Sequence, residues 1–290
     1  MNKAIAEVHC AVLRDGRRLA WANYGDPAGR PVLYLHGIPG SRLELAGADA
    51  AARTAGLRLI AVDRPGCGRS DPRPDLTFGN YAADVTQLLD ALSVSAVDVV
   101  AASGGGGFGL GLAASSQARV RRLILICVMA PSAPREALRG RQPRISFAYA
   151  LARRAPWLLR PWLKRQVRSM SAADPARLAR WARSLPPADR AAMLDPHLRQ
   201  LINLDTAEAL RQGPAAAVAE LALYGQPPGF AFTDIVAGVH LLHGAEDHTV
   251  PVGVAQWLTH ELPNATLEVI PRAGHWFAIA MPDRVMQLLS

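Results

Sequence analysis

The sequence predicts an α/β fold, with a mostly parallel sheet of roughly eight strands flanked by helices and an all-helical cap inserted after the sixth strand. Short apolar runs typical of buried strands alternate with segments of helical length, an order that indicates right-handed crossovers between parallel strands. The alternation stops near Met129 and resumes near Val239. We therefore expect residues 1–130 and 234–290 to form the core and residues 131–233 to form the cap.

A predicted β-hairpin opens the core. Residues 8–13 and 19–24 have the pattern of antiparallel strands, and Asp15 and Gly16 between them are typical of a hairpin turn. Near-continuous apolar runs then predict strands that are buried on both faces. The elements expected next are strands 31–37 and 57–63 and helices 43–55 and 78–92.

The rest of the core follows the same alternation, interrupted by the cap. Residues 129–230 show no strand pattern and consist of arginine-rich helical pieces punctuated by prolines. The elements expected on either side are strands 97–102, 120–128, 239–244 and 266–270 and helices 109–114, 252–262 and one that begins near 281.

The predicted strand 97–102 ends at a serine that is followed by four glycines. A strand, a tight turn and a helix place Ser103 at a sharp corner with strained backbone angles, and small neighbours such as Ala101 and Gly105 let the two arms of the turn approach each other. The Ser103 hydroxyl then points outward, with the backbone N–H of Gly104 facing the same space. This geometry is that of a nucleophile elbow.

A glycine-rich phosphate loop is the alternative interpretation of this stretch. A P-loop requires a lysine, and none lies near Gly104. A dinucleotide fingerprint requires an acidic residue about 20 positions further on, but residues 123–128 contain none and the next acid is Glu136. The elbow is therefore the favoured interpretation.

Four motifs together resemble those of the α/β-hydrolase-fold enzymes. His36–Gly40 resembles the oxyanion loop, and Asp63–Ser70 resembles the D-x-x-G-x-G-x-S turn after the next strand. Ala101–Gly105 is the elbow, with alanine where the usual motif has glycine. Gly244–Pro251 and Gly274–Trp276 supply an acid and a base. The resemblance covers residues of both core segments.

The resemblance and the chemistry of acyl transfer imply the same catalytic residues. A serine hydroxyl is a poor nucleophile, so we expect His275 to accept the proton of Ser103 and Asp247 to hold the imidazole in the required tautomer. The order serine, aspartate, histidine is the one that this fold uses. The backbone N–H groups of Ile38 and Gly104 are the expected oxyanion donors.

Other residues near these motifs have weaker claims. Glu246 is the alternative acid, although a shift of one residue at this turn would point it elsewhere. The second acid position used by some relatives, after strand 120–128, holds no carboxylate. The histidines expected to be structural are His36, His243 and His260, and the candidates for the substrate pocket are Phe108, His248 and Trp276.

The positive charge of the chain belongs to the cap. The formal net charge is +8, and residues 135–211 hold 16 Lys and Arg against 6 Asp and Glu. A solvated surface is one interpretation, and an acidic partner is the other; no nucleic-acid motif accompanies the arginines.

Residues 155–165 mix large apolar and cationic side chains, which suggests an apolar tunnel with a cationic mouth. We expect a hydrophobic acyl substrate, with an acidic end as a further hypothesis.

Composition sets limits on compartment and cofactors. The N-terminus has no long apolar stretch typical of a secretory signal, and no run approaches the roughly 18 apolar residues of a membrane span, so we expect a cytoplasmic protein without membrane insertion. Cys10, Cys67 and Cys127 are widely spaced, so neither disulfides nor a zinc site are expected. We expect no metal and no cofactor, and the sequence does not predict the oligomeric state.

These observations predict a cofactor-independent serine hydrolase that cleaves an ester or related carbonyl through an acyl-Ser103 intermediate. The same site also supports C–C bond hydrolysis or acyl transfer, and a non-catalytic ligand-binding protein of this fold is the third alternative. An aspartate nucleophile, which other enzymes of this fold use, is excluded by Ser103.

Overall fold

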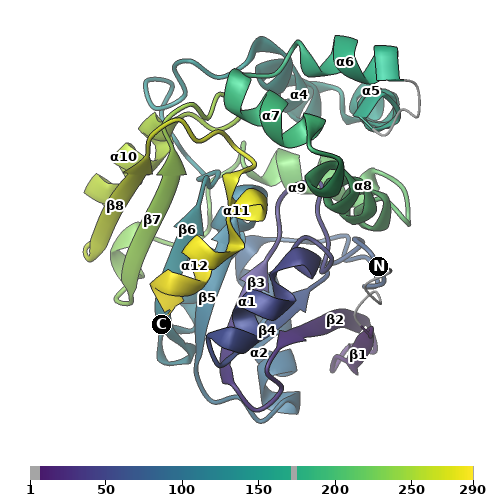
Figure 1. Ribbon diagram of the computed structural model, residues 1–290. Coiled ribbons are helices and arrows are strands. Elements are labelled where there is room, and N and C mark those ends of the chain that lie inside the picture. Colours follow the sequence, from purple (N-terminus) through teal and green to yellow (C-terminus); the bar gives the residue numbers. More distant parts are fainter. Residues whose placement is uncertain (1–6, 171–174, 290) are drawn as a thin grey trace.

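The computed structural model describes residues 7–170 and 175–289. Over these ranges eight strands form one sheet in the order β1-β2-β4-β3-β5-β6-β7-β8 (Figure 1). Strand β2 is antiparallel to β1 and β4, and every other neighbouring pair is parallel, as the sequence predicts. The strands are β1 His9–Val12, β2 Arg18–Gly25, β3 Arg30–Leu35, β4 Leu57–Val62, β5 Val97–Ala102, β6 Val120–Ile126, β7 Gly238–Gly244 and β8 Ala265–Ile270.

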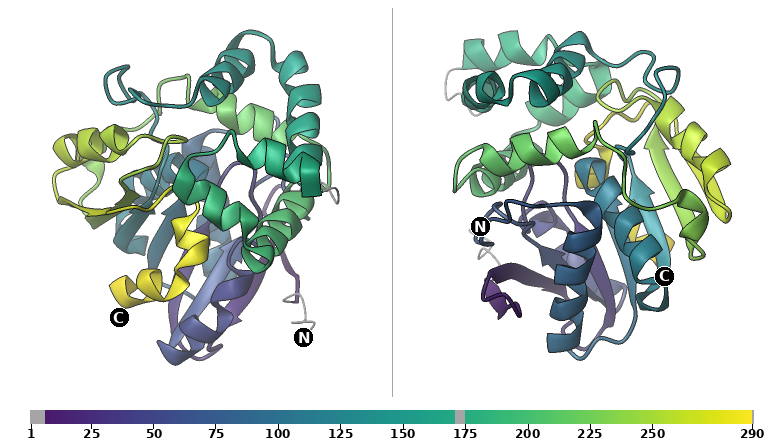
Figure 2. Two further views of the ribbon diagram at one scale, coloured as in Figure 1. Left: turned by 45° about the horizontal axis from the view of Figure 1, so that its top comes forward. Right: turned by 180° about the vertical axis from the view of Figure 1, so that it is seen from behind.

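Both faces of the central strands are buried, so their apolar runs are nearly continuous. In β3, Leu33 and Leu35 belong to one hydrophobic cluster, whereas Val32 and Tyr34 belong to the cluster on the other face. The period of two along a strand divides the run between two cores. Figure 2 shows helices on both sides of the sheet. Helices α2 Phe78–Ala91, α3 Gly106–Ser115 and α10 Val252–Glu261 cover the first face, and α1 Asp49–Thr54 and α12 Pro282–Leu289 cover the second.

Two predicted helices differ in the structure. The helix expected over 43–55 is shorter and consists of a 3₁₀ turn, Ala46–Ala48, followed by α1. The preceding segment remains a loop because its backbone is held by side chains: the Ser41 N–H donates to Asp205, and the Arg42 N–H donates to Asp63. The helix after the elbow begins earlier than predicted, at Gly106, after the 3₁₀ turn Ser103–Gly105.

Helices α4 to α9 lie between β6 and β7 in the sequence, and we call them the cap helices. Their prolines begin helices more often than they interrupt them, because the first helical position needs no backbone N–H. Pro143, Pro187 and Pro196 each occupy such a position. The cap helices are α4 Pro143–Arg154, α5 Pro156–Met170, α6 Pro175–Ala182, α7 Pro187–Leu194, α8 Pro196–Ala209 and α9 Ala215–Leu223.

Buried ion pairs connect the cap helices to the core. Arg64, which follows β4, pairs with Glu220 of α9 through an Nε–Oε1 distance of 2.6 Å, and both side chains are fully buried. Arg42 contacts Glu208 of α8 and Asp63 of the core at 2.7 and 2.6 Å. No helix within the described residues has the length and apolar character of a membrane span.

Candidate active site

Ser103 lies at the end of β5, at the start of the turn into α3. Its φ angle is 46°, in the left-handed region that L-residues rarely adopt, as expected for a nucleophile elbow. Gly105 passes so close to β3 that a Cβ atom there would lie 2.2 Å from the Leu35 carbonyl oxygen. The fully buried Ala101 takes the place of the usual glycine. The backbone therefore holds the Ser103 hydroxyl above the end of the sheet.

A chain of hydrogen bonds joins three residues that are far apart in the sequence. His275 Nε2 lies 2.9 Å from Ser103 Oγ, and His275 Nδ1 lies 2.7 Å from Asp247 Oδ2. The residues come from the ends of β5 and β7 and from the loop after β8. The structure thus brings together the three side chains that the sequence predicts for nucleophile, base and acid, with the imidazole of His275 between the hydroxyl and the carboxylate.

Asp247 is buried and fixed by its own turn. The backbone N–H groups of Thr249 and Val250 both donate to Asp247 Oδ1 at 2.8 Å. Burial by itself would raise the pKa of Asp247, but the charge and hydrogen bond of His275, together with the nearby His243, lower the pKa of this carboxyl below its ordinary value. The carboxylate is therefore ionised and can stabilise a positive charge on His275.

His275 is more basic than a free imidazole. Burial would lower the pKa of His275, but Asp247 raises it above the ordinary value, and Asp189 and Glu44 add to that effect. Asp189 belongs to α7, and its carboxylate accepts the backbone N–H of Trp276 at 3.2 Å. A cap helix therefore contacts the loop that carries the base.

The two predicted oxyanion donors lie next to each other. A Cβ atom on Gly104 would lie 2.3 Å from Ile38 Cγ1, and one on Gly37 would lie 3.4 Å from Ser103 Cβ. The oxyanion loop is held in place by Arg64, whose guanidinium donates to the carbonyls of His36 and Gly37. The backbone N–H groups of Ile38 and Gly104 thus belong to segments that are adjacent to the serine.

Tyr224 fixes the other side of the elbow. Its hydroxyl donates to the Gly104 carbonyl at 2.9 Å and accepts the N–H of Gly107 at 2.8 Å. Tyr224 directly follows α9, so both the oxyanion loop and the elbow depend on residues from the end of the cap segment.

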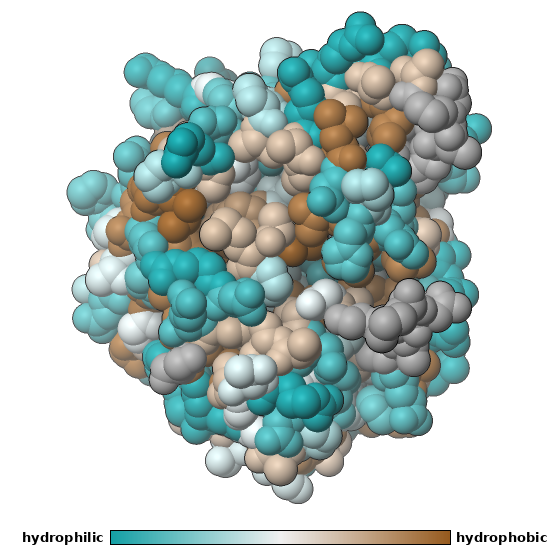
Figure 3. Space-filling model, in the orientation of Figure 1, coloured by the Kyte–Doolittle hydropathy of each residue, from teal (hydrophilic) through white to brown (hydrophobic). Residues whose placement is uncertain are grey.

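Two cavities open onto Ser103. The smaller, of about 50 Å³, is lined by Ser103 and His275 and by two carboxyl side chains, Glu44 and Asp205. Burial raises the pKa of both carboxyls, and the charge of Glu44 further raises that of Asp205. The larger cavity, of about 200 Å³, lies between the core and the cap helices and has a mostly apolar wall that includes Ile145, Ala148, Trp162, Leu163, Leu185 and Leu221. Figure 3 shows a hollow in the upper half of this face that is bordered by hydrophobic residues, with hydrophilic residues around it.

The three pocket candidates have different positions. Trp276 lines both cavities. Phe108 lies instead in the core beneath the elbow, with its ring 5.0 Å from that of Phe78, because the α3 side chain points toward α2 and away from the cavities. His248 is exposed, and its Nδ1 is 3.0 Å from the Gly140 carbonyl oxygen, so this side chain turns outward from the site.

Of the three histidines expected to be structural, His36 and His243 are buried and hydrogen-bonded, whereas His260 is exposed. His36 is fully buried, and its Nε2 accepts the backbone N–H of Arg64. Burial and the neighbouring charge of Arg64 lower the pKa of His36 well below the ordinary value, so the ring is neutral. His243 is buried and pairs with the Val250 carbonyl at 2.8 Å. His260 is exposed on α10.

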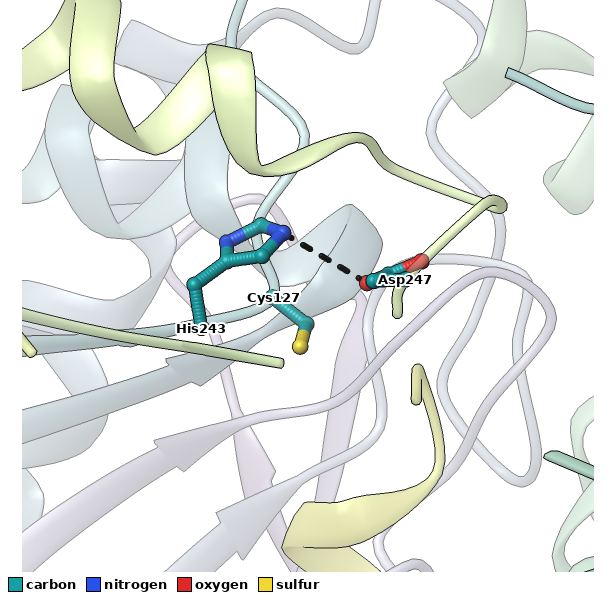
Figure 4. Close-up of side chains that lie close together, drawn as sticks. All are labelled: Cys127, His243 and Asp247. Atoms are coloured by element: carbon teal, nitrogen blue, oxygen red, sulfur yellow. Dashed lines mark ion pairs between the residues drawn. The ribbon is translucent and has the colours of Figure 1, made fainter. Parts of the chain in front are cut away.

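The side chains of Cys127, His243 and Asp247 lie close together (Figure 4), with their potential ligand atoms within 4.8 Å of one another. These residue types bind metals, but here the side chains have other partners. His243 Nε2 lies 2.8 Å from the Val250 carbonyl oxygen and 3.5 Å from Asp247 Oδ2. The same Asp247 Oδ2 lies 2.7 Å from His275 Nδ1. A metal ion would have to displace the imidazole of His275, so the group fits a buried support for Asp247 better than a metal centre.

Several contributors to the site carry no signal in the sequence. Arg64 follows a predicted strand, but its partner Glu220 is 156 residues away. Tyr224, Asp189 and Asp205 lie in or next to cap helices whose docking positions no local pattern predicts. Glu44 is only eight residues from His36, and its proximity to the predicted oxyanion loop is the one available hint.

Comparison with known proteins agrees with this architecture. The α/β-hydrolase fold family model matches residues 30–280. A 2-hydroxymuconate semialdehyde hydrolase from Pseudomonas putida is 25% identical over 300 residues, which cover 98% of this chain and 93% of that protein. A bromoperoxidase from Bacillus anthracis has a TM-score of 0.73 at 18% identity, with 98% of each chain covered. An esterase from Thermogutta terrifontis has a TM-score of 0.69 at 23% identity, with 98% of this chain and 97% of that chain covered.

These matches support a general hydrolytic function. The family model extends over both core segments and the cap between them, and the sheet and the elbow have the geometry that the resemblance implied. The chain belongs to the α/β-hydrolase fold family.

Proposed function

We propose that the protein is a serine hydrolase that cleaves an ester or related carbonyl of a hydrophobic small molecule through an acyl-Ser103 intermediate. The observation that carries the proposal is the hydrogen-bonded chain from Ser103 through His275 to Asp247, beside a largely apolar cavity of about 200 Å³. Catalysis by such a chain requires no bound cofactor.

In the first half of the reaction, Ser103 Oγ attacks the substrate carbonyl while His275 Nε2 takes its proton. Asp247 stabilises the imidazolium, and the N–H groups of Ile38 and Gly104 donate to the negatively charged oxygen of the tetrahedral intermediate. His275 then gives its proton to the leaving alkoxide as the bond to it breaks. Water repeats the sequence on the acyl-enzyme, releasing the acid and restoring the serine.

Hydrolysis of a C–C bond is the second candidate. It is favoured by the match to the 2-hydroxymuconate semialdehyde hydrolase, which extends over 98% of this chain. In that reaction the leaving group is a stabilised carbanion, which takes up a proton as the bond breaks. Analysis of the products formed from esters and from 2-hydroxymuconate semialdehyde distinguishes the two reactions.

Labelling with a fluorophosphonate tests the nucleophile. We expect the wild-type protein to gain one phosphonyl group on Ser103, located by peptide mass spectrometry, and the Ser103→Ala variant to gain none. A screen of p-nitrophenyl esters by acyl length then identifies the preferred substrate. Equal labelling of the Ser103→Ala variant, or ester hydrolysis that it retains, would reject the proposal.

A further inference from the structure

A third cavity lies beside the one that opens onto Ser103. It has a volume of about 330 Å³ and is formed by the segment after β6, by α4 and by the start of α10. Met129, Tyr149, Thr249 and Val250 line both this cavity and the apolar cavity at Ser103. A bound molecule that extends past these shared walls would reach from the serine into the third cavity.

Arginines dominate the charge of this third cavity. Arg135, Arg141, Arg153 and Arg154 line it, and no carboxylate is among its lining residues in the described ranges. Arg141 packs its guanidinium 4.5 Å from the centre of the Tyr149 ring and donates to Ser146 Oγ.

These arginines lack acidic partners. Within residues 7–170 and 175–289, Arg135, Arg153 and Arg154 form no ion pair, although the arginines at the junction of cap and core are paired. Cations that share a cavity repel one another, and an anion that enters relieves that repulsion. The planar guanidinium is well suited to binding carboxylate and phosphate oxygens in pairs.

We infer that this cavity binds an anionic group of the substrate, a carboxylate or a phosphate, carried at the end remote from the carbonyl that Ser103 attacks. The inference rests on the proposed function, because it assigns the far end of the same substrate. The apolar cavity then holds the intervening hydrocarbon, and the arginines select molecules with a charged terminus.

Paired substrates test the inference. One series consists of p-nitrophenyl half-esters of dicarboxylic acids of increasing length. The other consists of p-nitrophenyl esters of monocarboxylic acids of the same lengths, which lack the terminal carboxylate. A third series carries a terminal phosphate instead of the carboxylate and distinguishes the two anions. We expect the wild-type protein to have a higher kcat/KM for the anionic member of at least one pair.

The variant Arg153→Gln/Arg154→Gln removes two of the cations. Its ratio of kcat/KM for the anionic over the neutral substrate should fall by about tenfold or more. Arg160→Gln is the matched control, because Arg160 is an exposed arginine of α5 that lines neither cavity. The control should keep the ratio within about twofold of wild type. An equal ratio in the double variant and the wild-type protein, or no anionic preference in any series, would overturn the inference.

Binding to the Ser103→Ala protein separates this inference from the proposed function. Isothermal titration with adipate and with inorganic phosphate should show that at least one of the two anions binds, more weakly at higher salt and about tenfold more weakly in the triple variant that also carries Arg153→Gln and Arg154→Gln. Arginine-dependent binding without any hydrolysis would contradict the proposed function and leave the anion site standing. If hydrolysis depends on Ser103 but neither anion binding nor the rates depend on Arg153 and Arg154, the proposed function stands and the anion site is contradicted.

Discussion

Arginines at the junction of cap and core differ from those around the third cavity. Arg64 is completely buried and pairs with Glu220, and Arg42 pairs with two carboxylates. Arg153 and Arg154 are exposed and have no acidic partner among the described residues. The first set belongs to the core segment and is neutralised within the fold, whereas the second belongs to the basic cap segment and, within the described residues, is not. Paired arginines therefore connect the cap helices to the core, whereas unpaired ones leave positive charge available to a ligand.

The largest effect should come from the paired charge next to the reacting atoms. Asp247→Asn keeps the shape of the side chain but removes the charge that stabilises His275 and fixes its tautomer, so kcat should fall by about 10⁴. Glu246→Gln is the control, because it alters the neighbouring acid that the sequence left as an alternative. Steady-state kinetics on a p-nitrophenyl ester measures both, and a larger loss in Glu246→Gln would reverse the assignment.

The next largest effect should come from the paired charge at the cap junction. Glu220→Gln leaves Arg64 buried without its counter-ion, which should lower the free energy of unfolding by about 3–5 kcal/mol. Urea denaturation followed by circular dichroism measures the change. Replacing both residues with methionine should cost less than Glu220→Gln alone, because no uncompensated charge is then buried. A Glu220→Gln protein as stable as wild type would show that this pair does not hold the cap.

A smaller effect is expected on the pH dependence of kcat/KM. Only the neutral imidazole accepts the Ser103 proton, so kcat/KM should rise with pH through the pKa of His275, which lies above the ordinary 6.5 because of Asp247, Asp189 and Glu44. Asp189→Asn retains an acceptor for the Trp276 N–H but removes one negative charge, and should move this limb of the pH profile to lower pH. Glu261→Gln, which changes an exposed residue at the end of α10, should leave the limb in place. An unchanged profile in Asp189→Asn would limit Asp189 to a structural role.

The smallest effect should be on the stability of variants in the unpaired set. Arg153→Gln removes an exposed cation that has no acidic partner, so the free energy of unfolding should change by less than about 0.5 kcal/mol. The same urea titration checks it, and the contrast with Glu220→Gln measures the difference between the two sets directly. A loss similar to that of Glu220→Gln would mean that Arg153 has a structural role and would remove the distinction.

Much of the core could be predicted from local sequence. Near-continuous apolar runs predict where the buried strands lie in the sequence, because such strands are covered on both faces of the sheet. Ser103 and its small neighbours predict the elbow. The sequence also singled out Ser103, Asp247 and His275, and the structure brings them within hydrogen-bonding distance, while their catalytic roles remain the proposal tested above. The sequence predicts Phe108 and His248 in the substrate pocket, but Phe108 packs in the core and His248 faces outward. Proximity to a motif in the sequence does not determine the direction of a side chain.

By itself the sequence determined the α/β class and the positions of the motifs, since both depend on short-range patterns of apolar residues, glycines and turn residues. Only the tertiary structure decided which cap residues meet the site. Glu220, Tyr224 and Asp189 act on loops that lie 87 to 156 residues away in the chain, and Arg153 reaches a cavity shared with the core. Contacts of that kind depend on how whole helices dock, and helix docking is set by the packing of complete surfaces rather than by any local pattern.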